Sequence, residues 1–440
     1  MNMCSFFEKL SRLPANEDCL LTANFRLTRY ELLDKASQLR NRHPDLLGKK
    51  IALSDFSPLQ LIVALIAFDG VVRSMLIIPS SLDEKTKKNV IDAANCEYLF
   101  EKDNNLQSLK ISESKFKNKI TSWQLATSGT TGTPKIIDHN LKSLTHSVKY
   151  KSEKCGLFRW GLMYDPSRFA GLQVVLQALL GGSPLALPIN NSFDEQVKSL
   201  LLNNVNALSA TPSLWRKLLM NGAVNKLNLK QITLGGEIVE QSLIESLSKY
   251  FPDSRIVHIY ASTEAGTGFS VKDGLAGFPY EWVGNINAPV LLKIGPNNTL
   301  LIKPIEKPGG KEVSKRENAE GYLDTGDLVK VEKGRVYFCG RESGVINIGG
   351  NKVHPEEIES IIREVKGVIN VRVFAKKNSI MGQLVSAEIM CDKEMEENGM
   401  RKKLQRYCRE NLEAWQCPMK FAFVDEIETT KAGKVKRTTL

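Results

Sequence analysis

The sequence lacks several features that would assign it to a function class directly. Its eight cysteines form no CxxC pair, its five histidines form no HExxH, and metal-site spacing is absent. The most apolar stretch, LQLIVALIAFDGVV, has about ten apolar residues before Asp69, whereas a helix needs roughly 20 to cross a bilayer. These absences argue against a zinc site, a disulfide framework and a membrane span.

The N-terminal residues, MNMCSFFEKLSRLP, do not begin with basic residues followed by a long apolar segment. We therefore see no secretory signal. Without export, the cysteines are expected to be reduced thiols. The sequence predicts a cytoplasmic protein.

The 440 residues carry a formal net charge of +11. Such an excess could attract nucleic acid, a membrane surface, nucleotides or an acidic protein. No zinc-finger or RNP-type signature accompanies it, and the lysines are dispersed rather than striped with aromatic residues. We therefore do not expect a nucleic-acid partner.

Segments typical of strands and helices alternate through the first three quarters of the chain. LTRYELLDKASQLRNRH has the pattern of an amphipathic helix, and Thr28 and Glu31 have capping-box spacing. Alternation of this kind predicts an α/β fold with parallel sheets covered by helices. The later strand and helix segments are KKIALSDF, PLQLIVALIAFDGVV, SMLIIP, VNALSATPSLWRKLLMNG, LKQITLGGE, VEQSLIESLSKYFPD and SRIVHIYAS.

The pattern changes near VYFCGRESG. Beyond it come short strands, a helix opened by Pro355 and a basic helix around MRKKLQRYCRENL. These segments predict a separate α+β unit of about 100 residues, an ordinary size for a small domain. We place the boundary after Arg341, so that residues 1–341 form the large N-terminal domain and residues 342–440 the small C-terminal one.

The stretch TSGTTGTPK, residues 127–135, contains five hydroxyl side chains, two glycines and a final lysine. Glycine lets the backbone approach a ligand, N–H and hydroxyl groups donate to phosphate oxygens, and lysine neutralises charge. A polar surface loop has a similar composition. The stretch fits neither GxxxxGK[ST] nor GxGxxG. Taken alone, it leaves phosphate binding and an ordinary loop open.

TSGTTGTPK resembles the phosphate-loop signature of the adenylate-forming enzymes, the superfamily of acyl-CoA synthetases, luciferases and peptide-synthetase adenylation domains. Later signatures of that family follow in the same order, and the resemblance covers essentially the whole chain. It implies a large adenylation domain joined by a hinge at Ser343 to a mobile C-terminal lid. The later matches are LGGE, YASTE where the family usually has YGxTE, GYLDTGD, GRESGVINIGGNKVHPEEIE and GKVKR.

The resemblance implies a site for ATP. Asp327 would accept the ribose hydroxyls with Arg341 beside it, and Tyr260 would lie against the adenine. Without the resemblance, Asp327 would be interpreted as a turn residue and Tyr260 as a core residue. The other residues implied in nucleotide binding are Thr127, Ser128, Gly129, Thr130, Thr131, Gly132, Lys135, Gly235, Gly236, Glu237, Ala261 and Ser262.

Three residues would carry the chemistry. Glu264, at the end of a predicted strand, would help to hold Mg²⁺ on the nucleotide phosphates, and Thr263 would contact the α-phosphate. Lys434 would swing in from the lid and bind the substrate carboxylate together with the α-phosphate, because two anions must be brought into contact. Without the resemblance, Glu264 and Lys434 would be interpreted as solvated charges.

The substrate region departs from the family pattern. Many acyl-CoA synthetases carry PLFHxxGL where this chain has YDPSRFAGL, and alignment on Gly171 puts Arg168 in the position of the histidine, followed by Phe169. Arg168 would bind the substrate carboxylate or a second acid group, because guanidinium pairs bidentately with carboxylate. A surface arginine beside an apolar helix is the alternative. Ser209 and Gly235 complete the predicted substrate wall.

The implied reaction has two steps. A small carboxylic acid and MgATP give an acyl adenylate and pyrophosphate, and a thiol then displaces AMP. The chain length and GGNKVHPEEIE resemble compact acyl-CoA synthetases of the o-succinylbenzoate–CoA ligase type, which favours CoA as the thiol. Two alternatives remain: a free-standing enzyme that loads an acidic acyl carrier protein, and a non-catalytic nucleotide-binding homologue.

Overall fold

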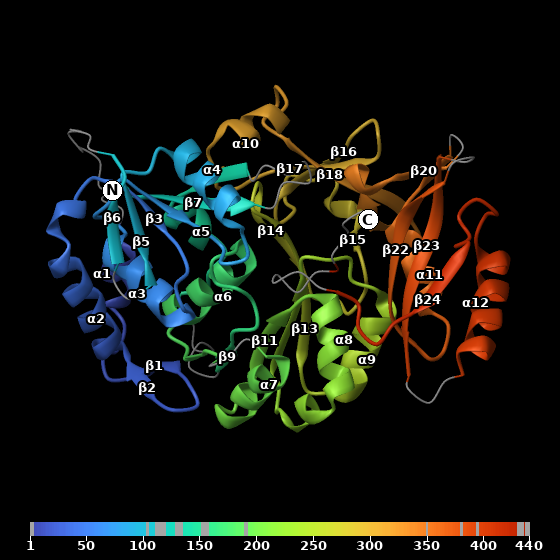
Figure 1. Ribbon diagram of the computed structural model, residues 1–440, viewed down its shortest axis with the longest axis horizontal. Coiled ribbons are helices and arrows are strands. Elements are labelled where there is room, and N and C mark those ends of the chain that lie inside the picture. Colours follow the sequence, from blue (N-terminus) through green and yellow to red (C-terminus); the bar gives the residue numbers. More distant parts are fainter. Residues whose placement is uncertain are drawn as a thin grey trace.

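The computed structural model describes residues 4–102, 105–110, 120–127, 135–150, 158–188, 192–348, 351–378, 382–392, 396–428 and 435. Figure 1 shows the N-terminal part of the chain on the left, in blue to green, and the C-terminal unit on the right, in orange to red. The predicted α/β fold is confirmed, with large sheets flanked by helices and a smaller C-terminal unit.

The first sheet has the strand order β6-β5-β3-β4-β7-β8. Its four central strands pair in parallel, and the two edge strands pair antiparallel to their neighbours. The buried helix predicted near Pro58 forms because Ser57 and Gln60 make a capping box. The elements are β3 (Lys50–Leu53), α3 (Pro58–Phe68), β4 (Ser74–Ile77), α4 (Glu84–Ala94), β5 (Tyr98–Glu101), β6 (Asn105–Ser108), β7 (Ser122–Thr127) and β8 (Lys135–His139).

The second sheet has the strand order β14-β13-β12-β11-β9-β10-β1-β2, and its six inner strands pair in parallel. The strands are β1 (Asp18–Leu21), β2 (Arg26–Thr28), β9 (Trp160–Gly161), β10 (Leu185–Ala186), β11 (Ala207–Ala210), β12 (Gln231–Gly235), β13 (Arg255–Ser262) and β14 (Gly266–Val271). The helices and short turns of this half are α1 (Phe6–Leu10), α2 (Arg29–Arg42), η1 (Pro44–Leu46), α5 (Leu141–Thr145), α6 (Phe169–Leu180), α7 (Phe193–Leu202), α8 (Pro212–Asn221), η4 (Ala223–Lys226) and α9 (Gln241–Tyr250).

The two faces of the second sheet meet different helices. Ile232 and Leu234 of β12 belong to a buried cluster with Trp215 of α8 and Leu247 of α9. Successive side chains of a strand point to opposite faces. On the other face, Gln231 and Thr233 line a cavity that Gln173 and Gln177 of α6 also line.

A third sheet was not predicted. Five antiparallel strands in the order β15-β19-β18-β17-β16 follow the second sheet, within the large domain for which mostly parallel sheets were expected. The alternation of strands and helices stops in this region, and the strands are joined by short connections, which permit antiparallel pairing. The elements are β15 (Phe278–Pro279), η5 (Tyr280–Trp282), β16 (Leu291–Ile294), β17 (Thr299–Lys303), α10 (Lys311–Arg316), β18 (Leu323–Glu332) and β19 (Arg335–Arg341).

The C-terminal unit has a core of its own, built from Ile358, Val371 and Leu404 among others. Its main sheet, β22-β23-β24, packs on α11 and α12, as Figure 1 shows. An α+β unit was expected here, and its boundary after residue 341 stays a prediction. The elements are η6 (Glu342–Gly344), β20 (Ile346–Ile348), β21 (Asn351–Val353), α11 (Pro355–Arg363), β22 (Val368–Asn378), β23 (Gly382–Cys391), α12 (Glu397–Asn411) and β24 (Lys420–Phe423).

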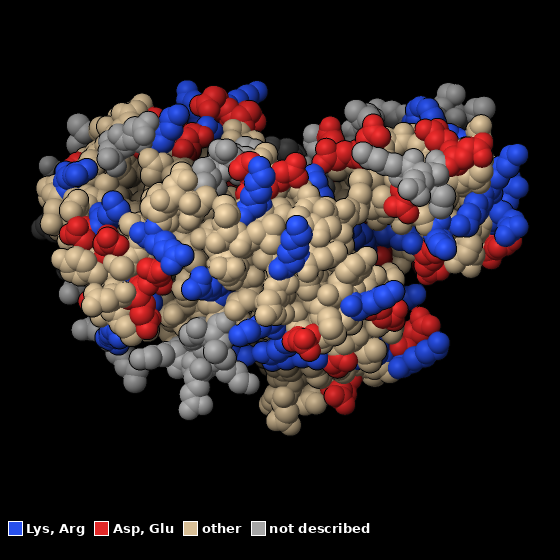
Figure 2. All heavy atoms as spheres, turned by 90° about the horizontal axis from the view of Figure 1, so that it is seen from below, with Lys and Arg blue, Asp and Glu red and all other residues tan. Residues whose placement is uncertain are grey.

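The described residues contain no helix of the length and apolarity that a membrane span requires. On the face shown in Figure 2, Lys and Arg are interspersed with Asp, Glu and broad uncharged areas. The positive charge is therefore not gathered into one stripe on that face.

Candidate functional site

A cavity of about 2250 Å³ contains most of the predicted site. It includes the carboxyl ends of β11, β12 and β13, where ligands commonly bind in parallel sheets, runs back along β12 and β13 to Gln231 and Arg255, and extends to the third sheet and to α11. Ser128, Gly129, Thr130, Thr131, Gly132 and Lys434 lie outside the described residues. The predicted residues that line the cavity are Thr127, Lys135, Arg168, Phe169, Ser209, Gly235, Gly236, Glu237, Tyr260, Ala261, Ser262, Thr263, Glu264, Asp327, Arg341 and Ser343.

Asp327 is held between two donors. The Tyr260 hydroxyl donates to Asp327 Oδ2 over 2.6 Å, and Arg341 Nε donates to Oδ1 over 2.9 Å. The charge of Asp327 is the main cause of the raised pKa of Arg341. Asp327 lies within β18 and not in a turn, although Gly326 before it has a φ of 68°. The two residues predicted to bind the ribose are thus brought together.

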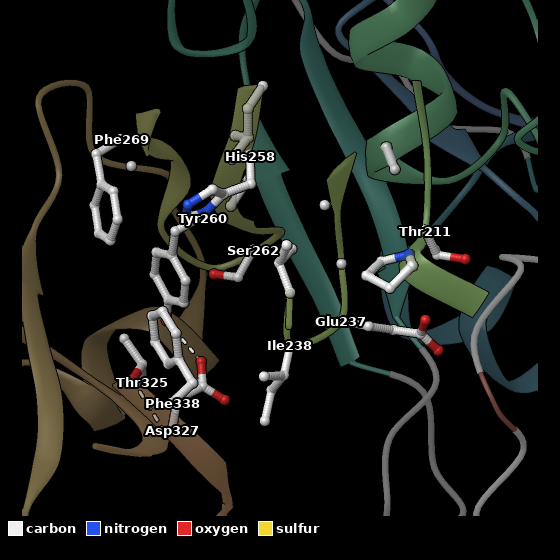
Figure 3. A pocket seen from close by; sticks show the side chains of 18 of the residues that line it. Thr211, Glu237, Ile238, His258, Tyr260, Ser262, Phe269, Thr325, Asp327 and Phe338 are labelled. Atoms are coloured by element: carbon white, nitrogen blue, oxygen red, sulfur yellow. Dashed lines mark hydrogen bonds between the residues drawn. The ribbon is translucent and has the colours of Figure 1, made fainter. Parts of the chain in front are cut away.

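Tyr260 lies in an aromatic stack. Its ring is 5.3 Å from that of Phe269 and 5.0 Å from that of Phe338, with interplanar angles of 18° and 7°. Burial and the Asp327 charge raise the pKa of Tyr260 well above its ordinary value. Figure 3 shows Tyr260 and Phe338 side by side above Asp327. Tyr260 is thus stacked with two aromatic rings beside the ribose acceptor, and its contact with adenine stays a prediction.

Thr263 and Glu264 follow the last strand residue, Ser262, so the expectation that Glu264 ends a strand was wrong by two residues. The backbone turns there, with the Ala265 N–H donating to Ser262 Oγ over 3.0 Å. Glu264 lines both the large cavity and a small adjoining hollow. No cluster of three potential metal ligands occurs within the described part of the chain. One carboxylate suits Mg²⁺, which is usually bound by one or two carboxylates plus substrate phosphates.

His139 links β8 to the Thr263 turn and was not identified from the sequence. Its Nε2 donates to the Thr263 carbonyl oxygen over 2.9 Å, and its Nδ1 lies 3.2 Å from Ser143 Oγ. The ring lies 5.6 Å from that of Phe169. His139 therefore fixes the turn that carries Glu264 against the strand that follows the phosphate-loop motif.

The burial of His139 has a consequence for stability. Burial is the main cause that lowers its pKa from 6.5 to about 4. Between these values the unfolded chain binds the proton and the folded chain does not, so stability is lost as the pH falls from 6.5 toward 4. The loss amounts to about 3 kcal/mol at pH 4. Urea unfolding at pH 7 and pH 4 should show this loss in the native chain, and His139→Gln should reduce it; an unchanged pH dependence would contradict the assignment.

Glu237 joins the cavity wall to the end of the chain. Its Oε2 accepts from the Ser213 N–H at the start of α8, and its Oε1 accepts from the Val435 N–H, both over 2.9 Å. In Figure 3 Glu237 lies beside Thr211 on the wall opposite Tyr260. Val435 directly follows Lys434 in the chain. The backbone next to the predicted catalytic lysine is thus anchored at the predicted substrate wall.

A second contact between the large and small units is ionic. Glu240 accepts from Arg216 Nη2 over 2.6 Å and from Arg363 Nε over 2.7 Å. Glu240, Arg216 and Arg363 have side-chain exposures of 10%, 13% and 14%. Burial is the first cause that lowers the pKa of Arg216, and the charge of Arg363 is the second. This Arg216–Glu240–Arg363 bridge connects α8 to α11.

Three of the predicted substrate residues, Arg168, Phe169 and Gly171, lie at the start of α6. An added Cβ at Gly171 would lie 2.2 Å from the Asp165 carbonyl oxygen, so glycine lets α6 approach that backbone. Gly171 packs in this way and is not among the cavity-lining residues. Ser209 forms a hydrogen bond with Tyr164, whose pKa burial raises.

Arg168 lies at the start of α6 and faces the cavity. Its Nη2 donates to Ser81 Oγ over 2.8 Å, and its Nε lies 4.0 Å from Asp165 Oδ2. Burial lowers its pKa. Part of the guanidinium is therefore already engaged by Ser81 and Asp165. Its contact with the substrate stays a prediction.

Family models match most of the chain. The AMP-binding enzyme model matches residues 63–323, and the AMP-binding enzyme C-terminal domain model matches residues 357–434. These matches cover both units of the structure.

Two groups of relatives are similar in sequence. The 2-succinylbenzoate–CoA ligase of Listeria monocytogenes is 26% identical over 328 residues, which cover 71% of this chain and 68% of that protein. The D-alanine–D-alanyl carrier protein ligase of Staphylococcus aureus is 25% identical over 455 aligned positions, which cover 93% of both chains.

Solved structures have the same fold. An anthranilate CoA ligase in complex with anthranoyl-AMP matches with a TM-score of 0.79 and 16% identity, over 98% of this chain and 95% of that one. The o-succinylbenzoate coenzyme A synthetase of Bacillus subtilis, in complex with ATP and magnesium ion, matches with a TM-score of 0.74 and 18% identity, over 98% and 97%.

Proposed function

The chain belongs to the AMP-binding enzyme family, and from this premise we propose that it activates a carboxylic acid with MgATP and transfers the acyl group to a thiol. One observation carries the proposal: a single cavity gathers the Asp327–Arg341 pair, Glu264 and the backbone next to Lys434. A ribose acceptor, a metal ligand and a cation are what the adenylation step requires.

The first half-reaction joins two anions. The carboxylate oxygen attacks the α-phosphorus, the bond to pyrophosphate breaks, and an acyl adenylate forms. Lys434 would neutralise both reactants, and Glu264 would hold Mg²⁺, which neutralises charge on the phosphates. Asp327 and Tyr260 would fix the nucleoside. Positioning of this kind lowers the barrier because the reactants lose their freedom before the reaction.

The second half-reaction needs a thiol. Its sulfur attacks the acyl carbon, the bond to AMP breaks, and a thioester forms. We propose CoA as the acceptor, because the stretch after the hinge resembles that of acyl-CoA synthetases. An acyl carrier protein is the second candidate, because the Staphylococcus relative that aligns over 93% of the chain is named a carrier protein ligase.

The acceptor site must open after adenylation. The Val435–Glu237 hydrogen bond holds Val435 at the substrate wall. We propose that the unit beyond Ser343 rotates and withdraws this residue before the thiol enters. We also propose a cytoplasmic location, which agrees with the seven free cysteines of the described residues.

The test is acid-dependent exchange of labelled pyrophosphate into ATP, across aryl, short, medium, long-chain and dicarboxylic acids. Exchange with one class of acid is the expected result. CoA and purified acyl carrier protein are then compared as acceptors with that acid. Tight MgATP binding without exchange for any acid would instead favour the non-catalytic homologue.

A further inference from the structure

Polar side chains recur along the wall of the cavity between the second sheet and α6. Ser209 and Thr233 are paired across neighbouring strands, so their side chains share a face. Gln231 lies two residues before Thr233 on the same face, and Ser270 pairs with Ile259 on β13. Gln173 and Gln177 of α6 line the cavity opposite them. Val174, Val257 and Ile259 line the same cavity, so the wall is mixed and offers polar as well as apolar contacts along the length of an acid.

Three solvent-exposed cations line the end of this cavity that is remote from the nucleotide residues. Arg255 is the first residue of β13. Lys272 directly follows β14, the strand that pairs antiparallel with β13, and the residue before it, Val271, pairs with His258. Lys149 follows α5 and lines the same cavity. From Ala261 to Arg255 the strand spans six residues, which is roughly 20 Å. The three cations are therefore far from the adenylation end.

The three cations line the same part of the cavity wall, and no opposite charge among the described residues separates Arg255 from Lys272. Partial burial is the first cause that lowers the pKa of Lys272, and the charges of Lys149 and Arg255 are the next. Asp273, the acidic residue after Lys272, is paired with Arg335 over 2.8 Å. Among the described residues, Arg255 and Lys272 have no carboxylate within ion-pair distance. An anion at this end of the cavity would relieve the repulsion.

We propose that the acid carries a second anionic group, a carboxylate or a phosphate, which Arg255, Lys272 and Lys149 bind at the remote end of the cavity. This inference rests on the proposed function, because the first carboxylate of the same acid is the one that is adenylated. The enzyme then prefers acids with two anionic ends to monocarboxylic acids of equal length. The mixed wall contacts the part of the acid between the two ends.

The test uses matched acids in the pyrophosphate exchange assay. Dicarboxylic acids of increasing length are compared with the monocarboxylic acids of equal length, and ω-phosphonocarboxylic acids distinguish a phosphate from a carboxylate. The variant is Arg255→Met/Lys272→Met. Lys226→Met is the control, because Lys226 is an exposed cation outside the cavity. Arg168→Ala is measured in parallel, because Arg168 is the other cation that could bind a second acid group.

We expect the double variant to raise the KM for the preferred dianionic acid about tenfold. The KM for ATP and for monocarboxylic acids should stay within twofold, as should all values for Lys226→Met. Equal use of the two acid types, or an effect confined to Arg168→Ala, would overturn the inference and leave the proposed function intact. Should no acid support exchange, the proposed function fails, and calorimetric binding of the dicarboxylic acids to the native chain and to the double variant decides on the anion site alone.

Discussion

Lys434→Ala is expected to lower the rate of adenylation about 10²- to 10³-fold, the usual effect of removing one group that stabilises developing charge. The N–H of Val435, the residue after Lys434 in the chain, is held by Glu237 at the substrate wall. An ammonium there would neutralise the carboxylate and the α-phosphate as they approach. Alanine leaves their repulsion uncompensated.

The second half-reaction separates this role from a general loss of structure. Transfer from a synthetic acyl adenylate to the thiol should keep most of its rate, because the lysine acts before the anhydride exists. Lys431→Ala, which removes a nearby lysine of the same tail, should leave both half-reactions close to native. Equal losses in adenylation and thiol transfer by Lys434→Ala would refute the assigned role.

Much of the fold could be predicted because local patterns decide it. The capping box of Thr28 and Glu31 starts α2 where it was expected, and apolar runs mark the strands of the two largely parallel sheets. The third sheet was missed because its short strands do not alternate with helices, which was the pattern used to predict the other two sheets. Asp327 looked like a turn residue, but pairing with Arg341 across β19 continues the strand past Gly326.

Some residues of the candidate site could be predicted from the sequence and others could not. Residues within motifs, such as Asp327, Arg341 and Glu264, could be assigned from the sequence, and the cavity gathers them. Residues that act through tertiary contacts could not. His139 reaches Thr263, which is 124 positions away, and Phe338 meets Tyr260 only after β19 pairs with β18. Val336 and Phe338 are two residues apart, a spacing that predicts side chains on the same face of a strand. This spacing could not show that Phe338 would stack on Tyr260.

Glu240→Ala is expected to favour thiol transfer over adenylation. Glu240 is the carboxylate that both Arg216 and Arg363 contact, and all three side chains are largely buried. Removing it leaves two arginines facing each other with Glu359, 3.8 Å from Arg363, as the remaining carboxylate, and breaking a buried pair in this way costs up to about 3–5 kcal/mol. Rotation of the C-terminal unit would relieve that cost by separating α11 from α8. The variant should therefore populate the rotated arrangement at the expense of the one that brings Lys434 to the wall.

Single-turnover assays of the two half-reactions measure this shift. Adenylation should fall about 10²-fold, which corresponds to about 3 kcal/mol, and thiol transfer from acyl adenylate should stay native or rise. Glu240→Ala/Arg363→Ala should recover part of the adenylation rate, because the second change removes one of the two opposed arginines. Glu413→Ala, at an exposed site of the small unit, is the control for altered surface charge. Equal losses in both half-reactions, with no recovery in the double variant, would mean that the bridge supports the structure without biasing the rotation.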